Sequence, residues 1–379
     1  MAKYKLGEIC EIVSGSTPKT GIAEYWDGNL KWITPAEIDD ESYIITDSAR
    51  KLTKLGVKKT GLSSFPSGTV ILSSRAPIGK VAIAGCEMYC NQGFKNLICS
   101  DRINNRYLYW FLKGNTAYLN SLGRGATFKE ISKKIVSDIE INVPEISQQL
   151  AAVDALERVS EIIRLRKNQL QKLDELIKAR FVELFGDPLT NPKGYQEKYL
   201  SEIAEYWNGL TYKPDDVANE GTIVLRSSNI QNASLDFADT VRVNCKIGTK
   251  KYVQDNDILM CSRNGSAKLV GKVALIKELS EPMSFGAFMM IIRSAYYPFL
   301  MTYFQLPAFR SQITTGATTT INQITGRMLD NVKLAIPDIE SAKDFSAFTN
   351  QVDKSKVAVQ KSLDEAQLLF DSLMQQYFG

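Results

Sequence analysis

Residues 145–186 read EISQQLAAVDALERVSEIIRLRKNQLQKLDELIKARFVELFG, and residues 338–379 read DIESAKDFSAFTNQVDKSKVAVQKSLDEAQLLFDSLMQQYFG. In both stretches apolar residues recur three or four positions apart, which places them on one face of an α-helix. Each stretch therefore predicts one long helix with a single apolar stripe. The two stripes consist of Val153, Leu156, Ile163, Leu170, Leu173, Ile177, Phe181 and Leu184, and of Phe345, Phe348, Val352, Val359, Leu363, Ala366, Phe370, Leu373 and Tyr377.

The predicted helices carry start and stop signals at their ends. Ser147 is the expected N-cap of the first helix, and Gly186 followed by Pro188 ends it. In the second helix, Ser341 and Asp344 have the spacing of a capping box. A helix of ~40 residues extends ~60 Å and projects beyond any domain of ~140 residues, so we expect the two stripes to pair as an antiparallel coiled coil. Pairing between two chains in a dimer is the alternative.

The remainder of the chain is duplicated. Leu6, Glu8, Ile9 and Gly15 recur as Leu200, Glu202, Ile203 and Gly209, at an offset of 194. Ser74-Arg75 recurs as Ser262-Arg263, and Gly79-Lys80-Val81-Ala82 recurs as Gly271-Lys272-Val273-Ala274. Solenoid repeats have periods of ~20 to 50 residues, so a repeat of this length indicates two copies of one domain. Because a duplicated chain imitates a twofold dimer, we expect pseudo-twofold symmetry.

The expected fold class is mixed α/β, with two tandem globular domains joined by the two long helices. Segments rich in Val and Ile at residues 31–34, 69–73, 80–84 and 97–99 predict strands, and residues 105–122 and 297–313 predict equivalent helices. The predicted organisation is a first globular domain at 1–144, a central spacer helix at 145–186, a second globular domain with its linker at 187–337, and a C-terminal spacer helix at 338–379.

Several classes of enzyme are excluded by what the sequence lacks. It contains no histidine, so Ser-His-Asp and Cys-His catalysis are excluded. The phosphate-binding, dinucleotide-binding, zinc-protease and nucleophile-elbow motifs are absent as well. Asn191-Pro192-Lys193 lacks the second proline and the aromatic residue of an amino-methyltransferase motif, and the six cysteines do not have the spacing of a zinc site. We therefore expect a non-catalytic chain with no metal or cofactor of its own.

The composition is that of a globular protein. The chain has 379 residues, of which 44% are hydrophobic and 23% charged. Met1-Ala2-Lys3-Tyr4 leads into a strand-like segment rather than an apolar leader, and no stretch approaches ~18 consecutive apolar residues. We expect a soluble, cytoplasmic protein that does not associate with membranes.

Positive charge is concentrated outside the two predicted helices. Of the 46 basic and 42 acidic residues, the stretches 145–184 and 338–378 hold 11 and 14, which leaves 35 and 28 in the globular parts. A basic excess in the globular domains is consistent with binding of a polyanion. It can equally serve solubility alone, and charge does not separate these two interpretations.

Polar and basic residues gather in the turns of both copies. Arginine can contact guanine bidentately, asparagine and glutamine can read adenine, and lysine can meet phosphate. Each such turn also has a purely structural interpretation, because Gly with Asn or Ser marks any turn. The recurrence of these turns in both halves favours a binding function. The candidate DNA-binding residues are Lys19, Arg75, Lys80, Asn91, Gln92, Lys95, Arg124, Lys129, Arg226, Asn229, Arg263, Asn264, Lys268, Lys272, Thr319 and Asn322.

Four motifs together resemble the specificity subunit of type I restriction-modification systems. They are residues 32–38 (WITPAEI), 73–79 (SSRAPIG), 91–95 (NQGFK) and 185–194 (FGDPLTNPKG), and the resemblance covers the whole chain. It implies two target recognition domains, each reading half of an asymmetric bipartite site in double-stranded DNA, with the helices setting the gap. It also implies two docked methyltransferase subunits, with restriction and translocase subunits in the full complex. S-adenosylmethionine, ATP and magnesium would belong to those partners.

The two copies differ where contacts with DNA are expected. The second copy has LRSSNI at 225–230 where the first has ITPAEI at 33–38, and SFGAF at 284–288 in place of NQGF at 91–94. Divergent loops on a shared frame are what two different half-sites require. Two other classes of function stay open: a scaffold that assembles protein partners through the helix pair without reading DNA, and a stand-alone nuclease or methyltransferase.

Overall fold

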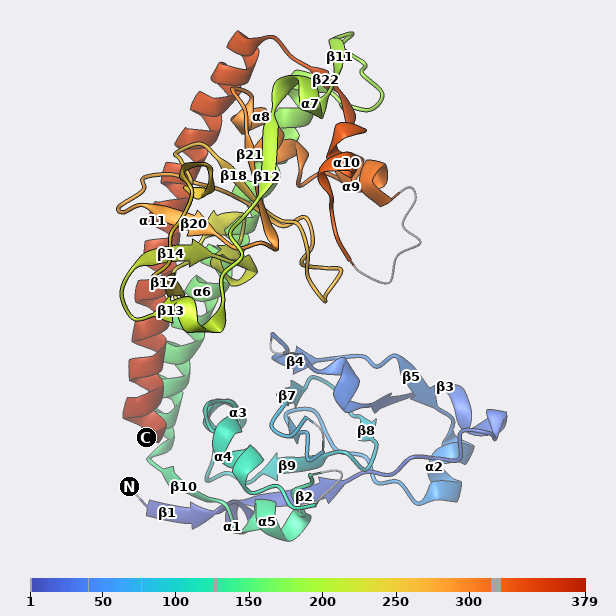
Figure 1. The fold of residues 1–379 in the computed structure, drawn as a ribbon. Coiled ribbons are helices and arrows are strands. Elements are labelled where there is room, and N and C mark those ends of the chain that lie inside the picture. Colours follow the sequence, from blue (N-terminus) through green and yellow to red (C-terminus); the bar gives the residue numbers. More distant parts are fainter. Residues whose placement is uncertain (1, 40, 76, 126–128, 315–321) are drawn as a thin grey trace. The chain divides into compact units, whose positions relative to one another are not determined.

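The computed structural model describes residues 2–39, 41–75, 77–125, 129–314 and 322–379. The chain divides into two compact units: unit 1 comprises Met1–Lys167 with Lys361–Gly379, and unit 2 comprises Asn168–Gln360. Figure 1 shows short strands and small helices in each unit. Both long helices contribute one half to each unit, so packing does not follow the four-part division expected from the sequence.

Unit 1 is built on a five-stranded sheet in the order β2-β9-β6-β7-β4, with a smaller sheet in the order β5-β3-β8. The central strand β6 and its neighbour β7 consist of buried aliphatic residues. In the smaller sheet, Trp26 and Trp32 pack edge to face with ring centroids 5.0 Å apart. The predicted strands correspond to β3, β6, β7 and β9. The strands are β2 Cys10–Ser14, β3 Trp26–Ile33, β4 Ile44–Ile45, β5 Arg50–Leu52, β6 Val70–Leu72, β7 Val81–Ala84, β8 Tyr89–Cys90 and β9 Lys95–Cys99.

An antiparallel ribbon of β1 and β10 and several short helices complete the globular part of unit 1. The helix predicted at 105–122 is broken at Asn115, whose backbone leaves the helical region with φ −101° and ψ 22°. Its side-chain amide also donates to the carbonyl of Phe111 at 2.9 Å, and α3 ends and α4 begins on either side of this residue. These elements are β1 Ala2–Lys5, α1 Leu6–Ile9, η1 Ala23–Tyr25, η2 Pro35–Glu37, α2 Lys54–Thr60, α3 Asn105–Gly114, α4 Thr116–Ser121, α5 Lys133–Ser137 and β10 Glu140–Val143.

Unit 2 repeats this plan with sheets in the orders β12-β21-β18-β19 and β13-β17-β14-β20, a ribbon of β11 and β22, and a small hairpin of β15 and β16. The predicted helix at 297–313 is again interrupted, and Pro307 begins its second part. The strands are β11 Gln196–Tyr199, β12 Glu205–Asn208, β13 Val217–Ala218, β14 Thr222–Leu225, β15 Ile230–Gln231, β16 Ser234–Leu235, β17 Arg242–Val243, β18 Ile258–Cys261, β19 Val273–Leu275, β20 Met283–Phe285, β21 Met289–Arg293 and β22 Lys333–Ile336. The helices are α7 Leu200–Ile203, η3 Pro214–Asp216, η4 Ser227–Asn229, η5 Thr249–Lys251, α8 Tyr297–Tyr303, α9 Pro307–Thr314 and α10 Gly326–Asp330.

The two long helices are α6, Ile146–Phe185, and α11, Ile339–Phe378, each of 40 residues. At the N-terminus of each helix, the capping residue predicted from the sequence differs from the one observed. Ser147 does not cap α6, because it is the second residue of the helix and the carbonyl of Glu145 accepts the first helical hydrogen bonds. In α11, Asp338 accepts the backbone N–H and the hydroxyl of Ser341 at 2.8 and 2.7 Å. Ser341 thus lies in the first turn, and the predicted capping box with Asp344 is wrong.

The long helices pack against each other through their apolar stripes in both units. In unit 1, Ile163 of α6 clusters with Ala366 of α11. In unit 2, the rings of Phe181 on α6 and Phe345 on α11 have centroids 5.7 Å apart. Early residues of α6 meet late residues of α11 and the reverse, so the pair is antiparallel, as predicted. Among the described residues, no helix has both the length and the apolar character needed to cross a membrane.

Candidate nucleic-acid interface

In unit 1, several loops converge at the end of the five-stranded sheet where β2 finishes and β9 begins. Backbone hydrogen bonds hold them together: Ser16 N–H donates to the carbonyl of Cys90 at 3.1 Å, and Ser74 N–H donates to that of Gly93 at 2.7 Å. Ile131 N–H donates to the carbonyl of Ser74 at 3.0 Å. We call these loops edge 1, defined by residues 14–19, 73–75, 90–95, 124 and 129–131.

A cluster of three charged side chains lies in edge 1. One carboxylate oxygen of Glu130 lies 2.8 Å from a guanidinium nitrogen of Arg75, and the other lies 3.3 Å from Lys95 Nζ. Lys95 is only 6% exposed and also donates to the hydroxyl of Ser74 at 3.2 Å. Burial raises the pKa of Glu130, but the hydrogen bond from Arg75 and the charge of Lys95 outweigh it and hold that pKa below its ordinary value. Glu130 therefore stays ionised between two cations.

Unit 2 contains an equivalent set of loops, with the same backbone connections. Ser262 N–H donates to the carbonyl of Phe288 at 2.9 Å, and Ile324 N–H donates to that of Ser262 at 2.7 Å. Asn264 N–H donates to the carbonyl of Asn322 at 3.3 Å. We call these loops edge 2, defined by residues 208–210, 262–264, 286–290 and 322–324.

The two edges share a backbone frame but carry different side chains. The hydrogen bonds and strand pairings give the equivalences Ser74 with Ser262, Arg75 with Arg263, Gly93 with Phe288, Lys95 with Met290, and Glu130 with Gln323. The charged pair of edge 1 is therefore neutral in edge 2. Arg263 instead lies over the ring of Phe288, with its guanidinium carbon 5.3 Å from the ring centroid. A ring face attracts a cation but supplies no counter-charge, unlike the carboxylate beside Arg75.

Three of the predicted DNA-binding residues have structural roles. Lys80 Nζ donates to the carbonyl of Pro35 at 3.0 Å, and Lys272 Nζ reaches the carbonyl of Ile230 at 3.5 Å. Asn229 is fully buried, and its side-chain amide donates to two backbone carbonyls at 2.8 Å. Because its carboxamide oxygen also accepts a backbone N–H at 2.8 Å, Asn229 has no free polar atom for a ligand. Its assignment as a DNA contact does not fit this geometry.

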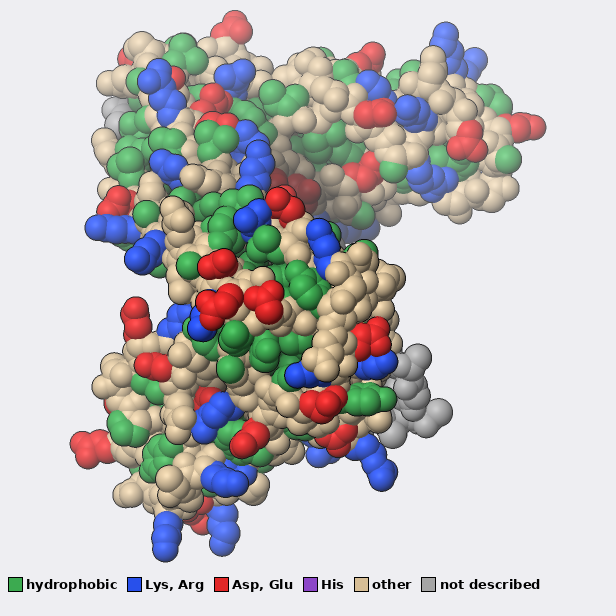
Figure 2. Space-filling view, turned by 90° about the horizontal axis from the view of Figure 1, so that it is seen from above, with side chains coloured by type: hydrophobic (Ala, Val, Ile, Leu, Met, Phe, Trp, Pro, Cys, Tyr) green, Lys and Arg blue, Asp and Glu red, His purple; other side chains and the backbone are tan. Residues whose placement is uncertain are grey.

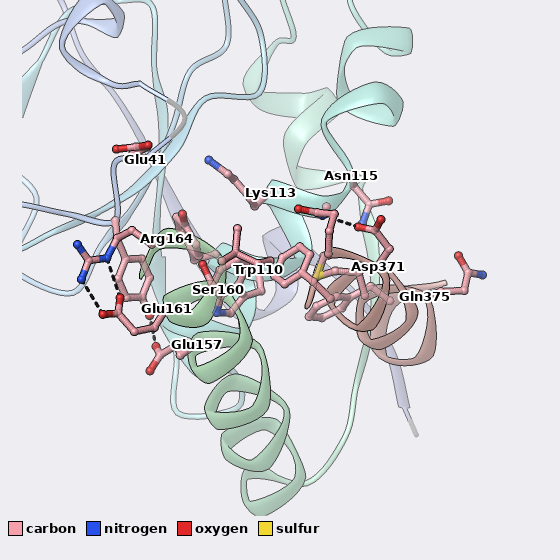
Figure 3. A pocket seen from close by; sticks show the side chains of 18 of the residues that line it. Glu41, Trp110, Lys113, Asn115, Glu157, Ser160, Glu161, Arg164, Asp371 and Gln375 are labelled. Atoms are coloured by element: carbon pink, nitrogen blue, oxygen red, sulfur yellow. Dashed lines mark hydrogen bonds and ion pairs between the residues drawn. The ribbon is translucent and has the colours of Figure 1, made fainter. Parts of the chain in front are cut away.

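Each unit also has a groove beside its portion of the helix pair. The groove of unit 1 is bordered by α3, α6 and α11 and has a volume of about 840 Å³; Figure 3 shows Glu157, Glu161 and Arg164 of α6 lining it. The groove of unit 2, of about 810 Å³, is bordered by α8 and the same two helices. Their chemistry differs, because Lys354 stands in unit 2 at the position of Glu161. Two identical partners would therefore meet different side chains in the two grooves. We interpret the grooves as a result of the repeated fold and not as two copies of one binding site.

The repeated architecture agrees with a family comparison. The family model described as the type I restriction modification DNA specificity domain matches the sequence twice, at residues 1–175 and 192–366. The chain belongs to this family. Each match contains one loop edge and at least part of the long helix that follows it. The resemblance inferred from the four sequence motifs is therefore confirmed.

Curated relatives are specificity subunits of the same family. The type I restriction enzyme MjaIX specificity subunit of Methanocaldococcus jannaschii is 36% identical over 223 residues, which cover 54% of this chain and 52% of that protein. The MjaVIII specificity subunit of the same organism is 21% identical over 373 residues, covering 92% of this chain and 85% of the relative. The EcoKI specificity subunit of Escherichia coli is 21% identical over 329 residues, covering 80% and 70%. The chain thus spans about half of the first relative and most of the other two.

Solved structures share the fold of this specificity-family chain. The S subunit of a type I restriction-modification system from M. genitalium superposes with a TM-score of 0.59 at 14% identity, covering 100% of this chain and 96% of that one. A chain from work on the assembly and conformational transition of the type I R-M system also gives 0.59, at 18% identity, covering 100% and 97%. The predicted fold of two tandem α/β domains with two long helices is confirmed.

The predicted DNA-binding residues of this specificity-family chain fall into groups by exposure. The exposed ones are Lys19, Arg75, Gln92, Arg124, Lys129, Arg263, Lys268 and Asn322. The half-buried ones are Lys80, Asn91, Arg226, Asn264 and Lys272, and the buried ones are Lys95 and Asn229. Thr319 lies outside the described residues. Figure 2 shows basic and acidic side chains interspersed on the face it draws, rather than one broad basic patch.

Sequence reasoning missed two residues of the edges, Glu130 and Phe288. An acidic residue is discounted in a search for polyanion contacts, although a carboxylate can orient an arginine. Phe288 is 59% exposed and lies beside Arg263 only in the fold, so the sequence carries no direct signal for it. The repeat singles out neither position, because Gln323 and Gly93 take their places in the other copy.

Proposed function

We propose that this chain is the DNA-recognition subunit of a type I restriction-modification complex. Unit 1 and unit 2 each read one half of an asymmetric bipartite site in double-stranded DNA, and α6 and α11 set the gap between the half-sites. The observation that carries the proposal is the pair of loop edges, which have the same backbone connections and different side chains. One frame with two sets of contact residues is the arrangement that two unlike half-sites require.

Chemistry is assigned to partner subunits. Because the curated relatives are specificity subunits, we assign this chain a non-catalytic role. The sequence also contains no histidine, which is the commonest general base. Two methyltransferase subunits dock on the chain, and restriction and translocase subunits join in the full complex. S-adenosylmethionine, ATP and magnesium are used by those partners and not held by this chain. The protein works in the cytoplasm, where its DNA is.

Selection from random DNA tests the recognition function. The full chain, assembled with the methyltransferase subunits of its own system, is incubated with a pool of random duplexes, and the bound fraction is sequenced. We expect enrichment of one bipartite motif, with affinity that falls steeply as salt rises, because each phosphate contact releases counterions. Methylome sequencing of cells that carry the system should show modification at the same motif.

A scaffold that assembles partners without reading DNA is the second candidate, and the helix pair is the observation that favours it. In the same selection, a scaffold would assemble the complex but enrich no motif. Methyl transfer by the purified chain alone would instead point to a stand-alone enzyme.

A further inference from the structure

We propose that Glu130 and Lys95 are positioning residues that fix the guanidinium of Arg75 so that it reads one base edge in the half-site of unit 1. This role rests on the DNA-recognition function proposed above. Glu130 and Lys95 would act through Arg75 and need not contact DNA themselves. Lys95 was predicted from the sequence as a DNA contact, but its ammonium is paired inside the protein.

The buried position of Lys95 makes Glu130 necessary in unit 1. Lys95 is 6% exposed, and an ammonium removed from water is costly unless it is paired and hydrogen-bonded. The carboxylate of Glu130 and the hydroxyl of Ser74 supply those partners at 3.3 and 3.2 Å. Lys95 thereby anchors Glu130 from the interior side, which limits the orientations open to its carboxylate.

The second oxygen of Glu130 faces the exposed arginine. It lies 2.8 Å from one terminal nitrogen of Arg75, whose side chain is 45% exposed. A guanidinium has five N–H donors, so a single contact with Glu130 leaves donors for two acceptors on a base edge, such as O6 and N7 of guanine. An arginine held in one orientation loses less conformational entropy when it binds, and it is correspondingly less tolerant of a different base.

Unit 2 shows what the same frame does without the charged pair. Met290 and Gln323 occupy the positions of Lys95 and Glu130, and Met290 is 2% exposed. The fold therefore accommodates a neutral pair at this place. The backbone frame therefore does not need Lys95 and Glu130 for its stability. We infer that the charged pair in unit 1 serves to position Arg75. Within the described part of the chain, Arg263 is stacked on Phe288 and forms no ion pair with a carboxylate.

Three variants of the full chain, each assembled with its methyltransferase subunits, test the role. They are Arg75→Ala, Glu130→Gln and the double variant K95M/E130Q, which reproduces the neutral pair of unit 2 and leaves no buried ammonium unpaired. Gln323→Glu is the matched control in unit 2. Binding is measured by competition between the duplex selected by the wild type and its single-base-pair variants, at several salt concentrations.

We expect all three variants to lose discrimination at the same single base pair of the unit 1 half-site, by roughly tenfold, the range of one bidentate contact. The control should leave that half-site unchanged. The salt slope of Glu130→Gln and of the double variant should not become shallower, because neither variant removes a phosphate contact and both release Arg75 from its counter-charge. A merely structural defect would weaken binding to all duplexes alike and would move no single position.

Two results would overturn the role. If K95M/E130Q discriminates as well as the wild type at every position while Arg75→Ala does not, Glu130 and Lys95 do not position Arg75. If Arg75→Ala changes no position, Arg75 does not read a base. Failure of the wild type to enrich any bipartite site is a separate outcome, and it counts against the proposed function itself.

Discussion

At the scale of single residues, Asp257 is a buried carboxylate on which part of unit 2 depends. It is 1% exposed and binds the guanidinium of Arg293 through both oxygens, at 2.7 and 2.8 Å. Arg293 in turn lies over the ring of Trp207, 5.0 Å from its centroid. Removing one partner of such a pair leaves the other without its counter-charge. We expect Asp257→Ala to lower the free energy of unfolding of unit 2 by about 3 kcal/mol.

Urea unfolding of the full chain, followed by circular dichroism, checks this value. Asp154→Ala is the matched control, because its ion pair with Arg158 is exposed, with side chains 60% and 76% accessible. Pairs at the surface contribute little, so the control should unfold as the wild type does. Equal losses in the two variants would show that burial of the Asp257 pair is not what stabilises unit 2.

The lowered pKa of Glu130 makes a prediction about acid stability. A carboxyl whose folded pKa lies below its ordinary value of 4.5 contributes stability above that value and loses it as the pH falls toward the folded pKa. K95M/E130Q lacks this carboxyl, so unit 1 of the variant should lose less stability than the wild type between about pH 5 and pH 3. Thermal unfolding at a series of pH values measures the difference. Parallel curves would mean that the Glu130 cluster does not add to acid sensitivity.

The candidate site could be predicted from the sequence only in part. The turns that carry Arg75 and Arg263 were found because Gly, Pro and Ser mark turns and because the motif repeats. The pairing of Arg75 with Glu130 could not be predicted, because the two residues are far apart in sequence and come together only in the fold. The same is true of Asn229, whose burial depends on which carbonyls surround it.

At the scale of elements, an aromatic cluster joins the second half of α6 to the small helix α8 and to α11. The ring of Phe181 is fully buried, with centroids 4.9 Å from Phe299 and 5.7 Å from Phe345. We expect Phe181→Ala to reduce the stability of unit 2 by about 3 to 5 kcal/mol, because truncation leaves a cavity between three elements.

Differential scanning calorimetry of the full chain measures this loss. Leu368→Ala on α11 is the control, since Leu368 is 70% exposed and its loss leaves no cavity. Its effect should stay within about 0.5 kcal/mol of the wild type. If the two variants melt alike, the helix pair does not depend on the aromatic cluster.

The elements differ in how well the sequence predicts them. Both long helices were predicted to within one residue at each end, because their apolar period is sustained over 40 residues. The helix at 105–122 was not predicted to break, because Asn115 is one polar residue within an apolar pattern and its non-helical backbone angles are not visible in the sequence. The caps were misplaced for a similar reason: Asp338 and Ser341 are both good capping residues, and spacing alone does not choose between them.

At the scale of the whole molecule, both long helices pass from one unit to the other at equivalent positions. The division falls between Lys167 and Asn168 on α6, and between Gln360 and Lys361 on α11, which are 193 residues apart, as are the two Phe-Gly ends. The apolar stripe continues through both positions, so the sequence gives no sign of the division. Residues added at these two points leave the contacts within each unit unchanged.

Inserting four helix-forming residues at both points therefore tests whether the helices set the gap. Four residues add ~6 Å, a little more than one helical turn, to each helix. Since DNA rises ~3.4 Å per base pair, the gap in the selected bipartite motif should lengthen by about two base pairs while both half-sites stay the same. Selection from random duplexes with the assembled complex reads out the gap directly. An insertion at one point only is the control, because it puts α6 and α11 out of register and should impair assembly. An unchanged gap in the double insertion would show that the helices do not measure the distance.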